Sequence, residues 1–335
     1  MLTIQAAVAV LLTLALVLAG GWPVIRWLRH IGMAGGGVRE DTPDSHRAKA
    51  GTPSMGGVLV VPVAAMAIGV AGLGDPMAVG VAGGMLGFAG IGAADDLLKA
   101  RRTSRRGLMA RTKFLLQVIV ATAVAFYAVL VMGNPGHVRL LPFMDTVDMG
   151  PWAIGLWILY LLWMTNAVNI TDGLDGLATG LTALACVPVF MAGLLTEAAG
   201  LTVGAAGILG GSTGFLRFNR RPAHVWMGDT GSLGLGAGLG CLGVLGSMEW
   251  LVLLAALPFT LELLSVVIQV VYFQATKRIY KLDEGRRVFR KAPLHHHFEE
   301  GGSSEARVVQ GFWAAGVGSA VLAMGLLIAE AGGLP

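Results

Sequence analysis

The sequence has little charge and few cysteines. Only 13% of its 335 residues are Asp, Glu, Lys or Arg, whereas about a quarter is usual in soluble domains, and an ordinary soluble domain is therefore excluded. Cys186 and Cys241 are the only cysteines, and both lie in apolar stretches, so we expect neither a disulfide nor a zinc site. Basic residues are not interleaved with aromatic ones, which disfavours a nucleic-acid partner.

Long apolar stretches make up most of the sequence. A membrane span needs roughly 20 apolar residues, and the pattern predicts an all-α, polytopic membrane protein with ten spans and one membrane-embedded domain over residues 1–335. No basic region precedes the first stretch, so we expect a retained helix and no signal peptide. Glycines such as those at 234, 236, 238 and 240 are read as helix-packing residues. The predicted spans are 3–22, 55–73, 76–94, 115–133, 151–165, 174–194, 199–216, 230–247, 249–275 and 308–331.

Positive charge is confined to one side of these spans. All but Arg139 of the 24 Lys and Arg residues fall in segments on that side. Short loops rich in Lys and Arg stay cytoplasmic, so we expect this face to be cytosolic and both termini to lie on the outer side. The acidic residues with potential for phosphate chemistry lie on the same face. Residues 134–150, on the other side, are expected to form a small hairpin or loop.

Acidic groups gather at two of the inner span ends. Asp95 and Asp96 close the third span, where a carboxylate pair favours magnesium binding or base chemistry. A solvated helix end, with Lys99 one turn from Asp95, is the alternative. Asp229 opens the eighth span, where backbone N–H groups attract phosphate. A magnesium ion could bridge this carboxylate to a phosphate, and a plain N-cap is the alternative.

Three further segments carry polar groups suited to a phosphorylated substrate. Residues 166–176 place Asn169, Asp172 and Asp175 in a Gly-rich turn without the spacing of a calcium loop. The consecutive histidines at 295–297 cannot all point one way, which disfavours a zinc site made by them alone and favours donation to phosphate with one imidazole free for proton transfer. Residues 49–57 offer a cation and two hydroxyls at a helix start. Glu262, inside a span, has either a structural partner or a role near the site.

Together these motifs resemble the polyprenyl-phosphate N-acetylhexosamine-1-phosphate transferases. The triple histidine after Ala-Pro and the run Gly-Thr-Pro-Ser-Met-Gly-Gly favour the phospho-N-acetylmuramoyl-pentapeptide transferase branch of that superfamily. The resemblance extends from about residue 45 to residue 307. Its motifs are Lys49 to Gly57, Asp95-Asp96 with Lys99, Asn166 to Gly176, Asn219 to Ser232, Leu264 to Gln269, and Ala292 to Glu299.

The resemblance implies a multi-pass enzyme of the bacterial cytoplasmic membrane. It would use Mg²⁺ to transfer phospho-N-acetylmuramoyl-pentapeptide from its UDP carrier to undecaprenyl phosphate, giving lipid I and UMP for peptidoglycan synthesis. Trp226, where the family commonly has Phe, would stack on uracil, and Ser54 replaces a common Thr. The stretch from 274 to 291 looks longer than expected. The implied catalytic residues are Asp95, Asp96, Asp229 and His296, the metal ligands are the same three aspartates, and the substrate-binding residues are Lys49, Ser54, Lys99, Lys113, Asn169, Asp172, Asp175, Asn219, Trp226, His295 and His297.

Two other functions stay open at this point. One is a sister transferase that uses UDP-N-acetylglucosamine. The other is a cation or phosphate transporter, although its charge should line a path between the two faces, and here only Glu262 lies inside a span. The sequence leaves open whether the chain forms a homodimer, and whether transfer is direct or passes through an aspartyl phosphate.

Overall fold

The computed structural model describes residues 1–33, 51–101 and 107–332, and it is built almost entirely of helices. One short antiparallel strand pair interrupts them. The elements are α1 (Leu2–His30), α3 (Gly57–Gly72), α4 (Pro76–Arg101), α5 (Ala110–Leu130), β1 (His137–Val138), β2 (Val147–Asp148), α6 (Trp152–Thr171), α7 (Leu177–Leu195), α8 (Ala199–Asn219), α9 (Gly228–Leu245), α10 (Glu249–Ala255), α11 (Leu257–Ile279), α12 (Leu294–Glu300) and α13 (Glu305–Ala331).

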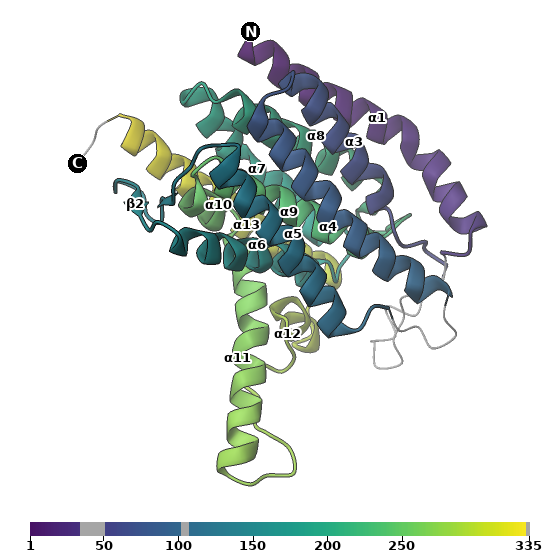
Figure 1. Cartoon of the computed structure of the whole chain (residues 1–335). Helices are drawn as coiled ribbons and strands as arrows, with labels where there is room; N and C mark the ends of the chain where they lie inside the picture. The colour runs from purple at the N-terminus through teal and green to yellow at the C-terminus, as the bar shows by residue number, and fades with distance from the viewer. Residues whose placement is uncertain (34–50, 102–106, 333–335) are drawn as a thin grey trace.

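Eight helices in the described ranges are long and apolar enough to cross a membrane: α1, α4, α5, α6, α7, α8, α11 and α13. The predicted all-α, multi-pass membrane protein is confirmed. The apolar helix α3 has only 16 residues, and the count of ten spans stays a prediction. The beginning of α1 and the end of α13 both lie in the upper half of Figure 1, away from α12.

Helix α9 lies in the centre of the bundle because its glycines let neighbouring helices approach on every side. A Cβ at Gly236 would lie 2.8 Å from the Cα of Thr165 in α6, and one at Gly238 would lie 2.7 Å from the side chain of Ile208 in α8. A Cβ at Gly234 would lie 2.8 Å from Val61 of α3. These contacts confirm the packing role predicted for the glycine run.

Several predicted span boundaries differ from the helix ends: α1 continues to His30 and α4 to Arg101, where the spans were expected to end at 22 and 94. The span expected at 249–275 is divided into α10 and α11 at Ala256, because Pro258 in the first turn of α11 has no N–H to continue the α10 hydrogen-bond ladder. The span expected to end at residue 165 continues to Thr171, so Asn166 and Asn169 lie on a helix and not in a turn.

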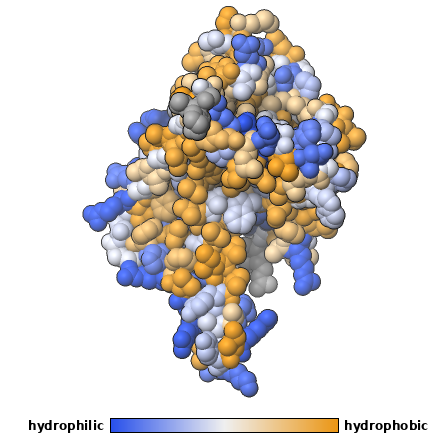
Figure 2. Space-filling view, turned by 90° about the vertical axis from the view of Figure 1, so that its left-hand side faces the viewer, coloured by the Kyte–Doolittle hydropathy of each residue, from blue (hydrophilic) through white to orange (hydrophobic). Residues whose placement is uncertain are grey.

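The segment predicted as a hairpin or loop at 134–150 contains β1 and β2, which pair antiparallel with His137 opposite Asp148. At the far end of the bundle, α11 extends well beyond the other helices (Figure 1). Figure 2 shows that apolar residues cover much of α11, while its tip is hydrophilic. Such a surface suits a helix that lies against lipid and ends at an aqueous boundary.

Candidate active site

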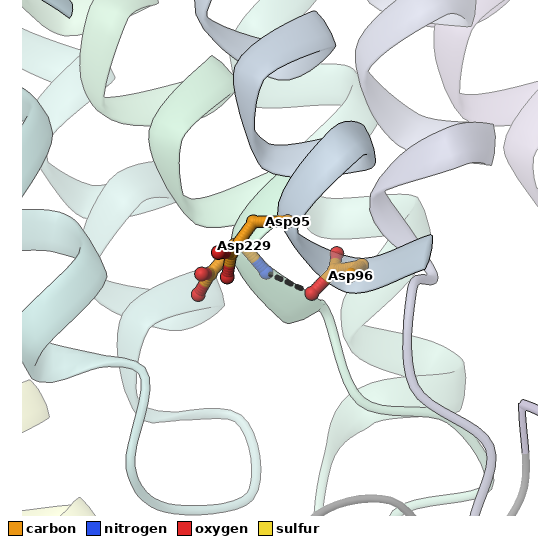
Figure 3. Close-up of side chains that lie close together, drawn as sticks. All are labelled: Asp95, Asp96 and Asp229. Carbon is orange, nitrogen blue, oxygen red and sulfur yellow. Dashed lines mark hydrogen bonds between the residues drawn. The ribbon is translucent and has the colours of Figure 1, made fainter. Parts of the chain in front are cut away.

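The predicted carboxylates come together from two helices. Asp95 and Asp96 lie near the end of α4, and Asp229 lies in the first turn of α9. One oxygen from each carboxylate lies within 4.8 Å of the others (Figure 3). Gly92, one turn before Asp96, permits this approach, because a Cβ there would lie 2.1 Å from the carbonyl oxygen of Asp229. Because Gly92 has no side chain, α4 can pack directly against the start of α9.

Asp96 caps the start of α9 from outside that helix. Its Oδ1 accepts the backbone N–H of Asp229 at 3.2 Å, the bond drawn in Figure 3. Its Oδ2 accepts the backbone N–H of Thr230 at 2.9 Å and the Thr230 hydroxyl at 2.7 Å. Free N–H groups at a helix start need acceptors, and this carboxylate supplies them. Most of the hydrogen-bonding capacity of Asp96 is therefore used within the protein.

Asp229 faces three polar side chains that the sequence predicted to bind substrate. Its Oδ2 accepts the ammonium groups of Lys99 at 2.8 Å and Lys113 at 2.7 Å, and its Oδ1 accepts the Asn169 amide at 2.9 Å. The Asn169 amide also donates to Ser232 at 2.8 Å. The two lysines come from α4 and α5 and the amide from α6, so the acidic cluster joins four helices.

Asp95 shares its cation with Asp229. Its Oδ2 lies 2.6 Å from the Lys99 ammonium, and its Oδ1 accepts the backbone N–H of Leu108 at 2.7 Å. The carboxylate is buried. The ion pair between Asp95 and Lys99, one helical turn apart, was the alternative to a catalytic role in the sequence analysis, and it is present. Because Lys99 also contacts Asp229, however, this pair belongs to the cluster and does not form a solvated helix end.

The turn after α6 adds two more carboxylates. The backbone N–H of Asp172 donates to the carbonyl of Val168 at 3.1 Å, but its carboxylate accepts no hydrogen bond within the described residues. The pKa of this carboxyl is well above its usual value because the group is buried and faces the negative charges of Asp229, Asp96 and Asp175. A cation in the cluster would offset that repulsion. Asp175 is buried, and its carboxylate accepts the backbone N–H of Ala223 at 3.1 Å and the indole N–H of Trp226 at 3.3 Å. It holds the loop before α9.

Trp226 is also fixed by the segment that leads into α3. Its backbone N–H donates to the carbonyl of Pro53, and its carbonyl accepts the N–H of Gly56, both at 2.8 Å. Ser54 lies within this segment and is partly exposed. Asn219 lies behind the loop: its amide donates to the carbonyl of Val225 at 3.1 Å and accepts the Thr179 hydroxyl at 2.6 Å. Its side chain positions the loop that carries Trp226.

The three histidines lie on the short helix α12 and point to different partners, as predicted. His295 is buried, with its Nδ1 3.3 Å from a Glu262 carboxylate oxygen. Nδ1 of His296 lies 2.9 Å from Glu299, and its side chain is 21% exposed. His297 accepts the backbone N–H of Arg290 at 3.0 Å. Nε2 takes part in none of these contacts in His296 or His297, whereas both ring nitrogens of His295 are buried and lack a hydrogen bond within the described residues.

His295 also links α12 to the acidic cluster. A Cβ at Gly173 would lie 2.4 Å from Nε2 of His295, so the histidine packs directly against the turn that carries Asp172. Glu262 accepts the backbone N–H of His295 at 3.1 Å, which gives this intramembrane carboxylate the structural partner that the sequence left open. Lys49, the remaining residue that was predicted to bind substrate, lies outside the described residues.

Sequence reasoning missed two residues that shape the site. Thr230 fixes Asp96, and its only sequence signal was the position next to Asp229. Glu305, buried in the first turn of α13, accepts the backbone N–H of Asp175 at 3.0 Å and lies 3.5 Å from Arg221. An acidic residue at a helix start is common, so nothing in the sequence marked Glu305 as a partner of a turn 130 residues away.

The donor set suits magnesium. Mg²⁺ prefers oxygen ligands and is usually held by one or two carboxylates together with phosphate oxygens. Asp229 and Asp95 offer such oxygens, with Asp96 behind them serving as the helix cap. Lys99 lies against oxygens of both Asp95 and Asp229, and Lys113 lies against an oxygen of Asp229, so positive charge already faces these carboxylates.

Comparison with known proteins gives the family of the chain. Residues 78–247 match the family model of glycosyl transferase family 4, and residues 49–61 match signature 1 of the phospho-N-acetylmuramoyl-pentapeptide-transferases. The chain is 41% identical to the protein of that name from Desulforudis audaxviator, over 96% of each chain. It is 44% identical to the one from Pelotomaculum thermopropionicum, over 92% of this chain and 93% of the relative. The chain therefore belongs to the phospho-N-acetylmuramoyl-pentapeptide transferase family.

Proposed function

We propose that this protein transfers phospho-N-acetylmuramoyl-pentapeptide from UDP-N-acetylmuramoyl-pentapeptide to undecaprenyl phosphate and releases UMP. The observation that carries the proposal is the cluster of Asp95, Asp96 and Asp229, whose oxygens lie within 4.8 Å of one another and are surrounded by Lys99, Lys113 and Asn169. Such a set of charges can hold two phosphorylated substrates next to each other. The family membership supports the choice of substrates.

The residues divide into those that hold the phosphates and those that hold the nucleoside. Lys99 and Lys113 would bind phosphate oxygens, and Asn169 would orient Asp229 through its amide. Trp226, fixed by Asp175, would stack on the uracil ring. His296 would donate to a phosphate oxygen. Lys49 and Ser54 would contact the nucleotide from the segment that leads into α3.

The reaction exchanges one pyrophosphate bond for another. An oxygen of the lipid phosphate forms a bond to the sugar-linked phosphorus, and the bond from that phosphorus to UMP breaks. Asp95 is placed to accept a proton from the lipid phosphate or to orient it, and Lys99 and Lys113 neutralise the charge that develops. When bound at Asp229 and Asp95, Mg²⁺ would supply further charge neutralisation. A direct transfer needs no covalent aspartyl phosphate.

The enzyme would work in the bacterial cytoplasmic membrane with this face in the cytosol. The proposal rests on the positive charge of the loops on that side, because short basic loops stay cytoplasmic. Ten spans would place both termini outside. UDP-linked substrates are soluble, so a cytosolic site at the end of α4 and α9 would meet them directly, while the lipid phosphate would arrive from the membrane.

Incubating the purified protein with undecaprenyl phosphate and each UDP-sugar tests the proposal. UMP release with UDP-N-acetylmuramoyl-pentapeptide, and none with UDP-N-acetylglucosamine, is the expected result. The Asp229→Asn variant is the matched control for contaminating activity. UMP release with UDP-N-acetylglucosamine alone would instead assign the protein to the sister activity.

A further inference from the structure

A basic pocket lies outside the site described above, where α8 ends beside α1. The pocket has a volume of about 250 Å³ and is lined by Arg217, Arg220, Arg221, Pro222 and His224. Three of these five residues carry positive charge, and all three arginines are exposed. The proposed transfer reaction uses none of them. The pocket therefore needs an explanation of its own.

The charge in this pocket is largely uncompensated. Arg221 lies 3.5 Å from a carboxylate oxygen of Glu305. In the described part of the chain, neither Arg217 nor Arg220 makes an ion pair, and the guanidinium carbon of Arg217 lies 6.0 Å from the centroid of the Phe218 ring. Nδ1 of His224 is buried and has no hydrogen-bond partner among those residues. Cations without an ion pair, beside a buried nitrogen without a partner, favour the binding of an anion with several oxygens.

Helix α1 packs against the pocket residue His224. The ring of Trp22 packs edge-on against His224, with the ring centroids 5.0 Å apart, and Trp22 remains 42% exposed. Arg26 and Arg29 follow Trp22 at the i+4 and i+7 positions of α1, on the same helical face. Tryptophan and arginine near the end of an apolar helix are typical of the level of the lipid head groups.

These observations combine into one assignment. We propose that the pocket binds the phosphate of an anionic phospholipid head group, with Arg217 and Arg220 contacting the phosphate oxygens and Trp22 lying along the glycerol region. A soluble phosphate would meet the same cations. The lipid is favoured because the pocket opens beside α1, whose apolar part is mostly exposed on the bundle surface. The assignment is independent of the transfer reaction, because it concerns binding without substrate.

The test measures lipid binding by the full-length protein in a neutral detergent. Native mass spectrometry with increasing phosphatidylglycerol gives an affinity for wild type and for the double variant Arg217→Gln, Arg220→Gln. Each cation near a lipid surface contributes about five-fold in affinity, so the double variant should bind about 25-fold more weakly. The matched control is Lys277→Gln, Arg278→Gln, which removes the same charge from the exposed end of α11.

The outcomes separate the possibilities. Weaker binding of phosphatidylglycerol by the pocket variant, normal binding by the control variant and no specific binding of phosphatidylcholine would support the proposal. Equal affinity in all three proteins would overturn it. Competition by inorganic phosphate for the same arginines, at concentrations similar to those of the lipid, would overturn the lipid assignment in favour of a soluble phosphate. Melting temperatures without lipid verify that each variant is folded.

Discussion

Thr230 donates both its backbone N–H and its hydroxyl to one oxygen of Asp96, at 2.9 and 2.7 Å. This contact fastens the end of α4 to the beginning of α9. Asp95 precedes Asp96 on α4, and Asp229 precedes Thr230 on α9, so the contact also fixes the separation of the two other carboxylates. Asp96 therefore holds the two helices together, while the neighbouring Asp95 faces Lys99 in the acidic cluster.

Replacing Asp96 should cost stability as well as activity. Loss of an N-cap costs about 0.5–2 kcal/mol, so we expect Asp96→Ala to lower the melting temperature of the detergent-solubilised protein. Thr230→Val, which removes only the hydroxyl donor, should lower it less. An Asp96→Ala protein that melts like wild type yet has no activity would show that Asp96 acts on the substrates or the metal and does not serve as a cap.

Asp229→Asn should abolish turnover while the protein stays folded. The amide has nearly the same size and keeps one accepting oxygen, but it removes the negative charge that faces Lys99 and Lys113 and would hold magnesium. UMP release and melting temperature are measured on the same preparation. Magnesium-dependent activity near the wild-type level would mean that the reaction does not need the negative charge of Asp229.

Trp226 should contribute to nucleotide binding through its ring. Stacking on a base is worth about 1–3 kcal/mol. Trp226→Ala should therefore increase KM for the UDP substrate by a factor between about five and somewhat more than a hundred. Trp226→Phe should retain most activity, because it keeps an aromatic face and loses only the hydrogen bond to Asp175. Unchanged nucleotide affinity together with a lowered melting temperature in the Ala variant would point to a purely structural indole.

Asp172→Asn should stabilise the magnesium-free protein. The pKa of Asp172 is raised by burial and by neighbouring carboxylates, so the folded state holds this proton more tightly than the unfolded state does. Stability contributed by the proton is lost as pH rises above the unfolded pKa of about 3.9. The melting-temperature advantage of the Asn variant should therefore grow as pH rises from about 4, and shrink when magnesium is added. An advantage that is independent of pH would contradict this origin.

Labelling of single cysteines should place the whole site in the cytosol. Lys99, Asp172, Arg220 and His296 are suitable positions, because they lie in different segments that meet at the site or beside it. The natural cysteines at 186 and 241 are both free and buried, so replacing them gives a clean background. Reaction of any of the four positions with an impermeant reagent added from outside would refute the proposed orientation.

The sequence predicted which residues meet at the site better than it predicted the role of each residue there. Asp95, Asp229, Lys99, Lys113 and Asn169 meet as expected, because each lies at the end of an apolar stretch on one face. The sequence could not show that Asn219 and His297 hold loops, since their partners are backbone groups that only folding brings near. It also missed the break before α11, because Pro258 lies in an otherwise continuous apolar run.

The sequence by itself determined the membrane fold class, the single charged face and the residue types available for phosphate chemistry. These follow from local composition, because lipid requires apolar helices and loop charge has a sidedness. Only the tertiary structure decided which carboxylate caps a helix, which partners the three histidines have, and which of the pocket arginines makes an ion pair. Those roles depend on distances between segments far apart in the chain, set here by glycines that let α4 and α9 touch.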